Sequence, residues 1–157
     1  MIPLTRPAVA PRSMEYLAAV VESAHRSGDG EFTKRAEQKL LALHPGSAEV
    51  LLTTSCTHAL ELAVRLVGVG PGDEVIVPAF CFPSVANAVL MTGATVRFAD
   101  ADPDHLGSSV ASIRERLNAR TKAVIALHYG GVCVDGVEEL AADLATAGVA
   151  FIEDNAH

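Results

Sequence analysis

Short apolar runs alternate with helical stretches along most of the sequence, and this alternation limits the choice of fold more than any other feature. Each run is rich in Val, Ile, Leu or Ala, and Gly, Pro or Asp residues separate it from the neighbouring helical stretch. Such runs are typical of strands buried on both faces, and strands that alternate with helices pair in parallel. The sequence therefore predicts an α/β protein with a mostly parallel sheet and helices on both faces. The expected strands are 49–52, 74–77, 95–99, 123–127 and 149–152, and the expected helices between them are 57–67, 84–91, 109–117 and 137–147.

Two further helical segments come before this alternation. Ser13 is expected to cap a helix that runs to His25, and a second helix is expected over 31–43. The division predicted from this pattern is an N-terminal helical segment, 1–44, followed by a sheet domain, 45–157.

Composition and charge exclude several classes of protein. A chain of 157 residues suffices for one domain. Its net charge of −7 is spread along the sequence and its Lys and Arg residues form no run, which argues against a nucleic-acid partner.

No apolar stretch approaches the roughly 20 residues that span a bilayer, so neither a membrane partner nor a membrane span is expected and a cytoplasmic protein is predicted. Cys56, Cys81 and Cys133 lie far apart and form no CxxC pair, which argues against disulfides and a zinc site.

Residues that directly follow the strands are the candidates for function, because ligands of open α/β sheets bind beyond the carboxyl ends of the strands. The turn 53–58 places Thr, Ser and Cys before a helix, where free N–H groups and the helix dipole favour a phosphate. Ordinary helix capping explains the same residues and is more common. Phe80 and Phe82 follow the next strand, where a ring stacks on a planar ligand or fills the core.

The last strand runs directly into charged residues. Glu153, Asp154 and His157 follow it, and Asp154 is placed either to meet a cation or to cap a further helix.

An acidic cluster and a missing motif remove two other possibilities. Asp100, Asp102, Asp104 and His105 resemble the start of a calcium loop, but His105 and Ala111 stand where that loop needs Gly and Glu. We therefore expect a turn and no metal site. A dinucleotide-binding domain is disfavoured because no G-x-G-x-x-G follows a strand.

The order and spacing of several short motifs resemble the DegT/DnrJ/EryC1/StrS sugar aminotransferases, which have the aspartate aminotransferase fold. The resemblance spans nearly the whole chain. The motifs are Gly30-Glu31-Phe32-Thr33, Ser55-Cys56-Thr57-His58-Ala59-Leu60, Pro-Gly-Asp-Glu-Val-Ile-Val-Pro at 71–78, Asn87, Phe98-Ala-Asp-Ala-Asp-Pro-Asp104, Thr121-Lys-Ala-Val-Ile, His128-Tyr129-Gly130-Gly131 and Glu153-Asp154.

The resemblance implies pyridoxal phosphate as cofactor and a role for five residues. Cys56 and Thr57 would hold its phosphate at the helix start, and Phe82 would stack on the pyridine ring. Asp154 would pair with the ring nitrogen, and His157 would lie close to the ring hydroxyl. The resemblance assigns no secure role to His128, for which a core position is expected.

The resemblance also implies that a catalytic lysine is missing from these residues. Members form a Schiff base with a lysine downstream of the Glu-Asp motif, whereas this sequence has only Lys34, Lys39 and Lys122. By the same resemblance, 45–157 is expected to be only part of the large, cofactor-binding domain. The C-terminal small domain of the family is expected to be absent, and the chain alone is expected to be inactive.

Two functions are consistent with this pattern. The first is the N-terminal portion of a homodimeric aminotransferase that moves an amino group from an amino acid, expected to be glutamate, to a nucleotide-linked keto-deoxysugar in polysaccharide biosynthesis. The second is a non-catalytic truncated homologue that keeps a cofactor pocket or an interaction surface. Some relatives that carry histidine in place of the lysine are sugar dehydratases, and this alternative also stays open.

Overall fold

The structure is a computed structural model that describes residues 6–157, so the first five residues of the expected segment 1–44 lie outside the described residues. The chain divides into two compact units, Met1–Leu52 and Thr53–His157, and each is described by itself.

The first unit contains two helices, α1 (Ser13–Glu22) and α2 (Glu31–Leu43), and neither has a buried residue. Tyr16 of α1 and Phe32 of α2 lie with their ring centroids 5.4 Å apart. The described part of this unit therefore has aromatic contacts between helices and no closed core.

Both expected ends of α1 are wrong. Ser13 is the first helical residue and does not cap the helix; Arg12 is the N-cap and its guanidinium bonds to the carboxylate of Glu15. The helix ends at Glu22 before His25, because Ser23 donates its hydroxyl to a carbonyl of the last turn and the next residue, Ala24, has a left-handed φ of 59°.

The expected strand 49–52 does not form. Leu51 and Leu52 are exposed, and the described residues offer this segment no neighbouring strand. The Leu52 N–H instead donates to the side chain of Glu37 at 3.4 Å. Since a strand is stabilised by pairing and burial, the apolar run alone was a poor guide here.

The second unit is a four-stranded sheet in which every pair of neighbours is parallel, in the order β2-β1-β3-β4. This confirms the predicted α/β class. The elements are α3 (Cys56–Leu66), β1 (Glu74–Pro78), α4 (Ser84–Leu90), β2 (Thr95–Ala99), α5 (Val110–Arg116), β3 (Thr121–Leu127), the 3-10 turn η1 (Tyr129–Gly131), α6 (Val137–Ala147) and β4 (Ala150–Asp154).

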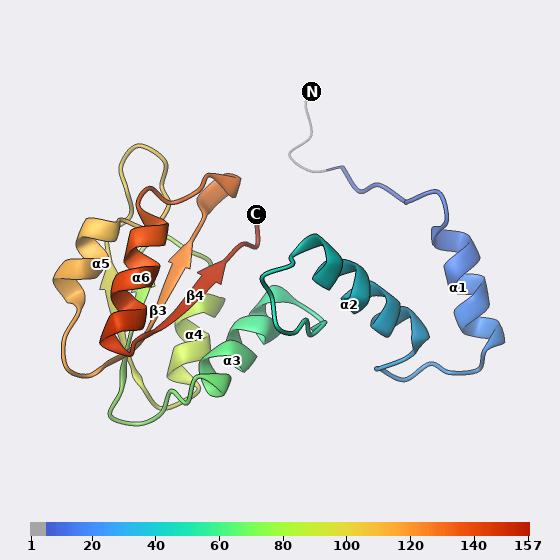
Figure 1. The fold of residues 1–157 in the computed structure, drawn as a ribbon, viewed down its shortest axis with the longest axis horizontal. Helices are drawn as coiled ribbons and strands as arrows, with labels where there is room; N and C mark the ends of the chain where they lie inside the picture. Colours follow the sequence, from blue (N-terminus) through green and yellow to red (C-terminus); the bar gives the residue numbers. More distant parts are fainter. Residues whose placement is uncertain (1–5) are drawn as a thin grey trace. The chain divides into compact units, whose positions relative to one another are not determined.

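Helices cover both faces of the sheet because successive strand residues point to opposite sides. Val75 and Ile125 pack toward Leu60 and Val64 of α3 and toward α4, whereas Ile76 belongs to the core under α5 and α6. Figure 1 shows α5 and α6 on one side of β3 and β4 and α4 on the other. The two apolar layers hold the strand ends in fixed positions.

The strand order creates a switch point between β1 and β3. From β1 the chain crosses through α4 to β2 on one side, and from β3 it crosses through α6 to β4 on the other. Crossovers that leave in opposite directions open a crevice outside the carboxyl ends of the two central strands, where ligands of such folds bind.

The opposite end of the sheet holds a buried carboxylate. Glu74, at the start of β1, accepts a hydrogen bond of 2.8 Å from the Asn118 amide and contacts Arg120 and, at 3.4 Å, Arg97. The Asn118 hydrogen bond, followed by the two guanidinium charges, lowers the pKa of Glu74 against the opposing effect of burial.

Described residues 6–157 contain no helix that is long and apolar enough to cross a membrane.

Candidate functional site

The start of α3 presents unpaired backbone donors beside the crevice. Ser55 is the N-cap, with extended φ and ψ, and its hydroxyl accepts the His58 N–H at 3.2 Å. That bond satisfies only one of the amides that a helix start leaves without an intrahelical acceptor. No acceptor for the amides of Cys56 and Thr57 occurs in the described part of the chain. Both N–H groups and the positive end of the helix dipole are therefore free to meet an anion.

Cys56 connects this helix start to the end of β4. Its thiol donates to Asp154 Oδ1 at 3.6 Å, and the Ala156 N–H donates to the same oxygen at 3.0 Å. Partial desolvation of the sulfur, followed by the charge and hydrogen bonding of Asp154, raises the pKa of the Cys56 thiol, although the residue as a whole is exposed. The sulfur is thus held as a neutral hydrogen-bond donor.

Asp154 is buried, with 5% of its surface exposed. A second thiol, that of Cys81, lies in the same environment; burial, followed by the charge of Asp154, raises its pKa. Cys81 donates to the Pro78 carbonyl at 3.2 Å. The carboxylate of Asp154 therefore has two neutral thiols near it and no cation among the described residues, since none of the recorded ion pairs includes it.

A hollow of about 290 Å³ opens in front of Asp154. Its volume lies just below the usual range of about 300–1,000 Å³ for ligand pockets. Aromatic rings form one wall: the centroid of Tyr129 lies 5.0 Å from that of Phe80 and 5.2 Å from that of His157. The lining residues are Phe80, Cys81, Phe82, Pro83, Leu127, Tyr129, Asp154, Ala156 and His157.

The ring of His157 is fixed by the turn after β3. The Gly130 N–H donates to His157 Nδ1 at 2.9 Å. Because Nδ1 accepts a hydrogen bond, the neutral ring carries its proton on Nε2. His157 is therefore set to donate from Nε2.

Four of the five residues expected at the cofactor site come together. Phe82, Asp154 and His157 line the hollow, and Cys56 contacts Asp154. Thr57 is the next residue of the same helical turn, is half-buried, and does not line the hollow. Phe82 is 73% exposed, so most of its side chain is accessible to a ligand.

Sequence reasoning missed the contribution of two residues. Tyr129 joins the aromatic wall, and Cys81 lies close to Asp154. Tyr129 had one available signal, namely an aromatic residue two positions after the end of a buried strand. The acidic cluster at 100–105 does not line the hollow. It stabilises the loop in which it lies, since Asp102 accepts the Asp104 N–H at 2.9 Å. In residues 6–157 no three His, Cys, Asp or Glu side chains are grouped to hold a metal.

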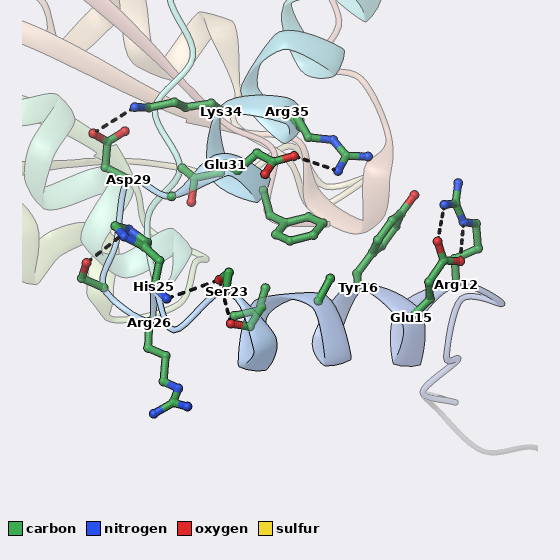
Figure 2. Close-up of a pocket in the computed structure, with 16 residues that line it drawn as sticks. Arg12, Glu15, Tyr16, Ser23, His25, Arg26, Asp29, Glu31, Lys34 and Arg35 are labelled. Carbon is green, nitrogen blue, oxygen red and sulfur yellow. Dashed lines mark hydrogen bonds and ion pairs between the residues drawn. The ribbon is translucent and has the colours of Figure 1, made fainter.

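A larger hollow of about 810 Å³ lies within the first unit. Figure 2 shows six of its charged side chains in three pairs, Arg12 with Glu15, Lys34 with Asp29, and Arg35 with Glu31, while Arg26 is drawn without such a contact. These pairs are exposed and already balanced, so they leave little charge for a ligand. The hollow at the strand ends is smaller, but it is lined by the buried carboxylate of Asp154 and by aromatic rings, and it is therefore the candidate site.

Solved aminotransferases share this fold over nearly the whole chain. The TM-score is 0.85 against 3-amino-5-hydroxybenzoic acid synthase, at 32% identity, covering 96% of this chain and 39% of that one. It is 0.86 against the aminotransferase TlmJ from Streptoalloteichus hindustanus, at 34% identity, covering 99% and 42%. The chain has the fold of the pyridoxal-phosphate-dependent aminotransferases. It belongs to the DegT/DnrJ/EryC1/StrS aminotransferase family, whose sequence pattern matches residues 7–157.

Curated relatives differ in the pathways their names describe. The chain is 33% identical over 156 residues to the spore coat polysaccharide biosynthesis protein SpsC of Bacillus subtilis, covering 99% of this chain and 39% of that protein. It is 34% identical over 134 residues to a UDP-4-amino-4-deoxy-L-arabinose–oxoglutarate aminotransferase of Shewanella sediminis, covering 85% and 34%. The chain thus spans about two fifths or less of the length of these relatives.

Proposed function

We propose that this chain is the cofactor-binding portion of a pyridoxal-phosphate-dependent sugar aminotransferase. The observation that carries the proposal is the buried carboxylate of Asp154, which faces an aromatic-walled hollow and is tied through Cys56 to a helix start with free N–H groups. A carboxylate and an anion-binding helix start match the two charged ends of this cofactor, its ring nitrogen and its phosphate.

Each residue has a role that follows from its place. The amides of Cys56 and Thr57 and the Thr57 hydroxyl would hold the phosphate, and Phe82 would cover one face of the ring. Asp154, held by the Ala156 N–H, would keep a proton on the ring nitrogen, and His157 would donate from Nε2 to the ring hydroxyl. When bound, the cofactor supplies an electron sink for the carbon that loses a proton.

The position of Lys122 supports the expectation that this chain alone does not transaminate. Lys122 lies near the start of β3, and five residues at about 3.3 Å each separate it by roughly 17 Å from Leu127 at the site. Lys34 and Lys39 belong to the first unit. We therefore propose that residues beyond these 157 supply the Schiff-base lysine and the small domain of the whole protein.

The proposed substrates of the whole protein are a nucleotide-linked keto-deoxysugar and an amino-acid donor, with glutamate as the donor and polysaccharide biosynthesis as the setting. The name of the Shewanella relative pairs a nucleotide sugar with oxoglutarate. The nucleotide sugar supports the proposed sugar substrate, and oxoglutarate, the keto acid that corresponds to glutamate, supports the proposed donor. Cys56 and the opening Gly28-Asp-Gly-Glu-Phe-Thr33 resemble transaminases that form dTDP-4-amino-4,6-dideoxygalactose, so we favour a dTDP-linked 4-keto-6-deoxyhexose. A cytoplasmic homodimer is part of the same proposal.

The second candidate is a non-catalytic homologue that binds the cofactor without a reaction. The absence of a lysine at the strand ends of the second unit favours it for this chain taken alone. A dehydratase differs from an aminotransferase at the position of the missing lysine and stays open for the whole protein.

A titration with pyridoxamine 5′-phosphate tests the site. This form has no aldehyde, so it cannot react with Lys34, Lys39 or Lys122 and reports non-covalent binding alone. We expect saturable binding that Asp154→Asn weakens at least about tenfold, because a hydrogen bond to a charged group contributes about 1.5–3 kcal/mol. The control Asp143→Asn removes an exposed aspartate of α6 and should leave binding unchanged.

Borohydride reduction of the pyridoxal phosphate complex, followed by peptide mapping, tests the lysine. We expect no single lysine to be fixed in stoichiometric yield. Fixation at Lys122 would contradict the placement of the site at the carboxyl ends of the strands, and equal binding by Asp154→Asn and the parent chain would contradict the proposed function.

A further inference from the structure

After β3 the chain forms a loop at residues 129–133, here called the arch, and its two ends, or feet, are His128 and Val134. A hydrogen bond between these two residues closes the loop. Val134 donates its N–H to His128 Nδ1 at 3.1 Å, so the side chain at one foot of the arch holds the backbone at the other. Both feet are buried, with 7% of His128 and 2% of Val134 exposed. A buried N–H without an acceptor is costly, so this bond constrains the loop between the two residues.

The ring of His128 uses its second nitrogen as well. Nε2 lies 3.0 Å from Oε1 of Glu153, one residue before Asp154, and the His128 N–H donates to the Asp154 carbonyl at 3.2 Å. With Nδ1 acting as an acceptor, the neutral ring must carry its proton on Nε2 and donate it to Glu153. His128 therefore joins the arch to the end of β4 on which Asp154 stands.

The arch carries two groups into the candidate site. The Tyr129 ring forms the middle of the aromatic wall, and the Gly130 N–H sets the tautomer of His157. Gly130 and Gly131 have φ of 63° and 79°, a backbone conformation that other residues adopt with strain. The turn itself is shaped by two backbone hydrogen bonds of 3.1 Å, from the Gly131 N–H to the His128 carbonyl and from the Val132 N–H to the Tyr129 carbonyl. The hydrogen bonds of the His128 ring, to Val134 and Glu153, fix the position of this turn relative to the end of β4, and with it the direction of the Gly130 N–H.

We propose that His128 is a positioning residue: it closes the arch 129–133 through Val134 and thereby directs the Gly130 N–H at His157 Nδ1, so that His157 presents Nε2–H to the hollow. His128 itself does not line that hollow. The part of this inference that concerns cofactor rests on the proposed function, whereas the tautomer of His157 does not.

Two substitutions separate the partners of the His128 ring. In His128→Asn the side-chain Oδ1 occupies the position of Nδ1 and can still accept the Val134 N–H, but the link to Glu153 is lost. In His128→Gln the amide reaches toward Glu153 and the acceptor for Val134 is lost. We expect His157 to keep its Nε2–H tautomer in His128→Asn and to populate both tautomers in His128→Gln.

Long-range ¹H–¹⁵N spectra of the labelled 157-residue chain read this out, at a pH well above the ordinary histidine pKa of about 6.5. The His157 signals are assigned from their loss in His157→Asn, and His44→Gln, a substitution of an exposed histidine in the first unit, is the matched control. In the unsubstituted chain, ¹⁵N–¹⁵N couplings across both N–H···N bonds, Val134 to His128 and Gly130 to His157, are expected without any mutation.

Three results would overturn the inference. The first is the absence of the Gly130–His157 coupling, and the second is an unchanged His157 tautomer in His128→Gln. The third is loss of the Nε2–H tautomer in His128→Asn alone, which would mean that the bond to Glu153, and not the bond to Val134, positions the loop. A merely structural histidine would lower the melting temperature of both variants and leave the tautomer as it is. For pyridoxamine 5′-phosphate we expect a loss of affinity of about three- to tenfold in His128→Gln only; if the chain does not bind this ligand, the proposed function fails while the tautomer test still stands.

Discussion

Replacement of Thr57 by Val removes one hydroxyl from the proposed phosphate site and changes little else. Val and Thr have similar shape and similar helix propensity, so α3 should keep its stability to within a few tenths of a kcal/mol. The Ser55 cap, which bonds to His58, is not touched by the substitution. The effect of Thr57→Val on ligand affinity can therefore be attributed to the hydroxyl.

The size of the effect follows from the donors at the helix start. A hydrogen bond from a hydroxyl to a charged phosphate contributes about 1.5–3 kcal/mol, or about 10- to 150-fold in affinity. The amides of Cys56 and Thr57 remain in the variant and continue to meet the anion. We therefore expect the lower part of that range, about 10- to 30-fold.

Calorimetric titration with two ligands isolates the phosphate. Pyridoxamine 5′-phosphate should bind Thr57→Val about 10- to 30-fold more weakly, whereas pyridoxamine, which lacks the phosphate, should bind the variant and the parent chain equally. Thr57→Ser keeps the hydroxyl and should bind both ligands to within about threefold of the parent chain. Equal losses for the two ligands, or no loss for either, would refute the assignment of Thr57 to the phosphate.

Two further predictions concern the sheet that carries the site. Ile125 of β3 is fully buried against α3 and α4. Ile125→Ala should therefore lower the free energy of unfolding, measured in urea, by about 3–4 kcal/mol, and Ile125→Val should lower it by about 1 kcal/mol. A loss below about 1 kcal/mol for the alanine variant would mean that this layer is loosely packed. In the folded chain the pKa of Glu74 lies below its ordinary value of 4.5. The Glu74 carboxylate therefore stabilises the fold at pH values above 4.5, and this stabilisation is lost as the pH falls through the lowered pKa of the folded state. Glu74→Gln should therefore be less stable than the parent chain at pH 7 and lose less stability on acidification, as measured by urea unfolding at a series of pH values; parallel pH curves for the two chains would contradict the pKa shift.

Regular elements with dense apolar patterns were predictable from the sequence. The helix over Val137–Ala147 and the strand over Thr95–Ala99 have the predicted bounds. Turn residues limit both elements, two leucines of the helix are buried against the sheet, and the strand pairs along its whole length with β1. The expected strand 49–52 had a similar apolar pattern and still failed, since no neighbour pairs with it among the described residues. Local pattern predicts an element only where tertiary pairing supports it.

The site was predictable to the extent that it lies at strand ends. Asp154 follows a strong apolar run, and its position at the carboxyl edge of a parallel sheet could be inferred from that alone. The partner of the Cys56 thiol could not, because 98 residues separate it from Asp154 and only the folded sheet brings them together. The role of Tyr129 depends on the left-handed glycines after it, whose conformation no periodicity reveals.

The strand that ends in Asp154 has a single paired neighbour in the described structure. β4 is bonded along one side to β3, whereas β1 and β3 each have a partner on both sides. Local opening begins at such edges, so backbone amides of β4 should exchange with solvent deuterium sooner than those of the central strands. A ligand that pairs with Asp154 binds only the closed form and shifts this opening equilibrium toward it. Slower exchange in β4 would then register occupancy of the site, even where no reaction follows.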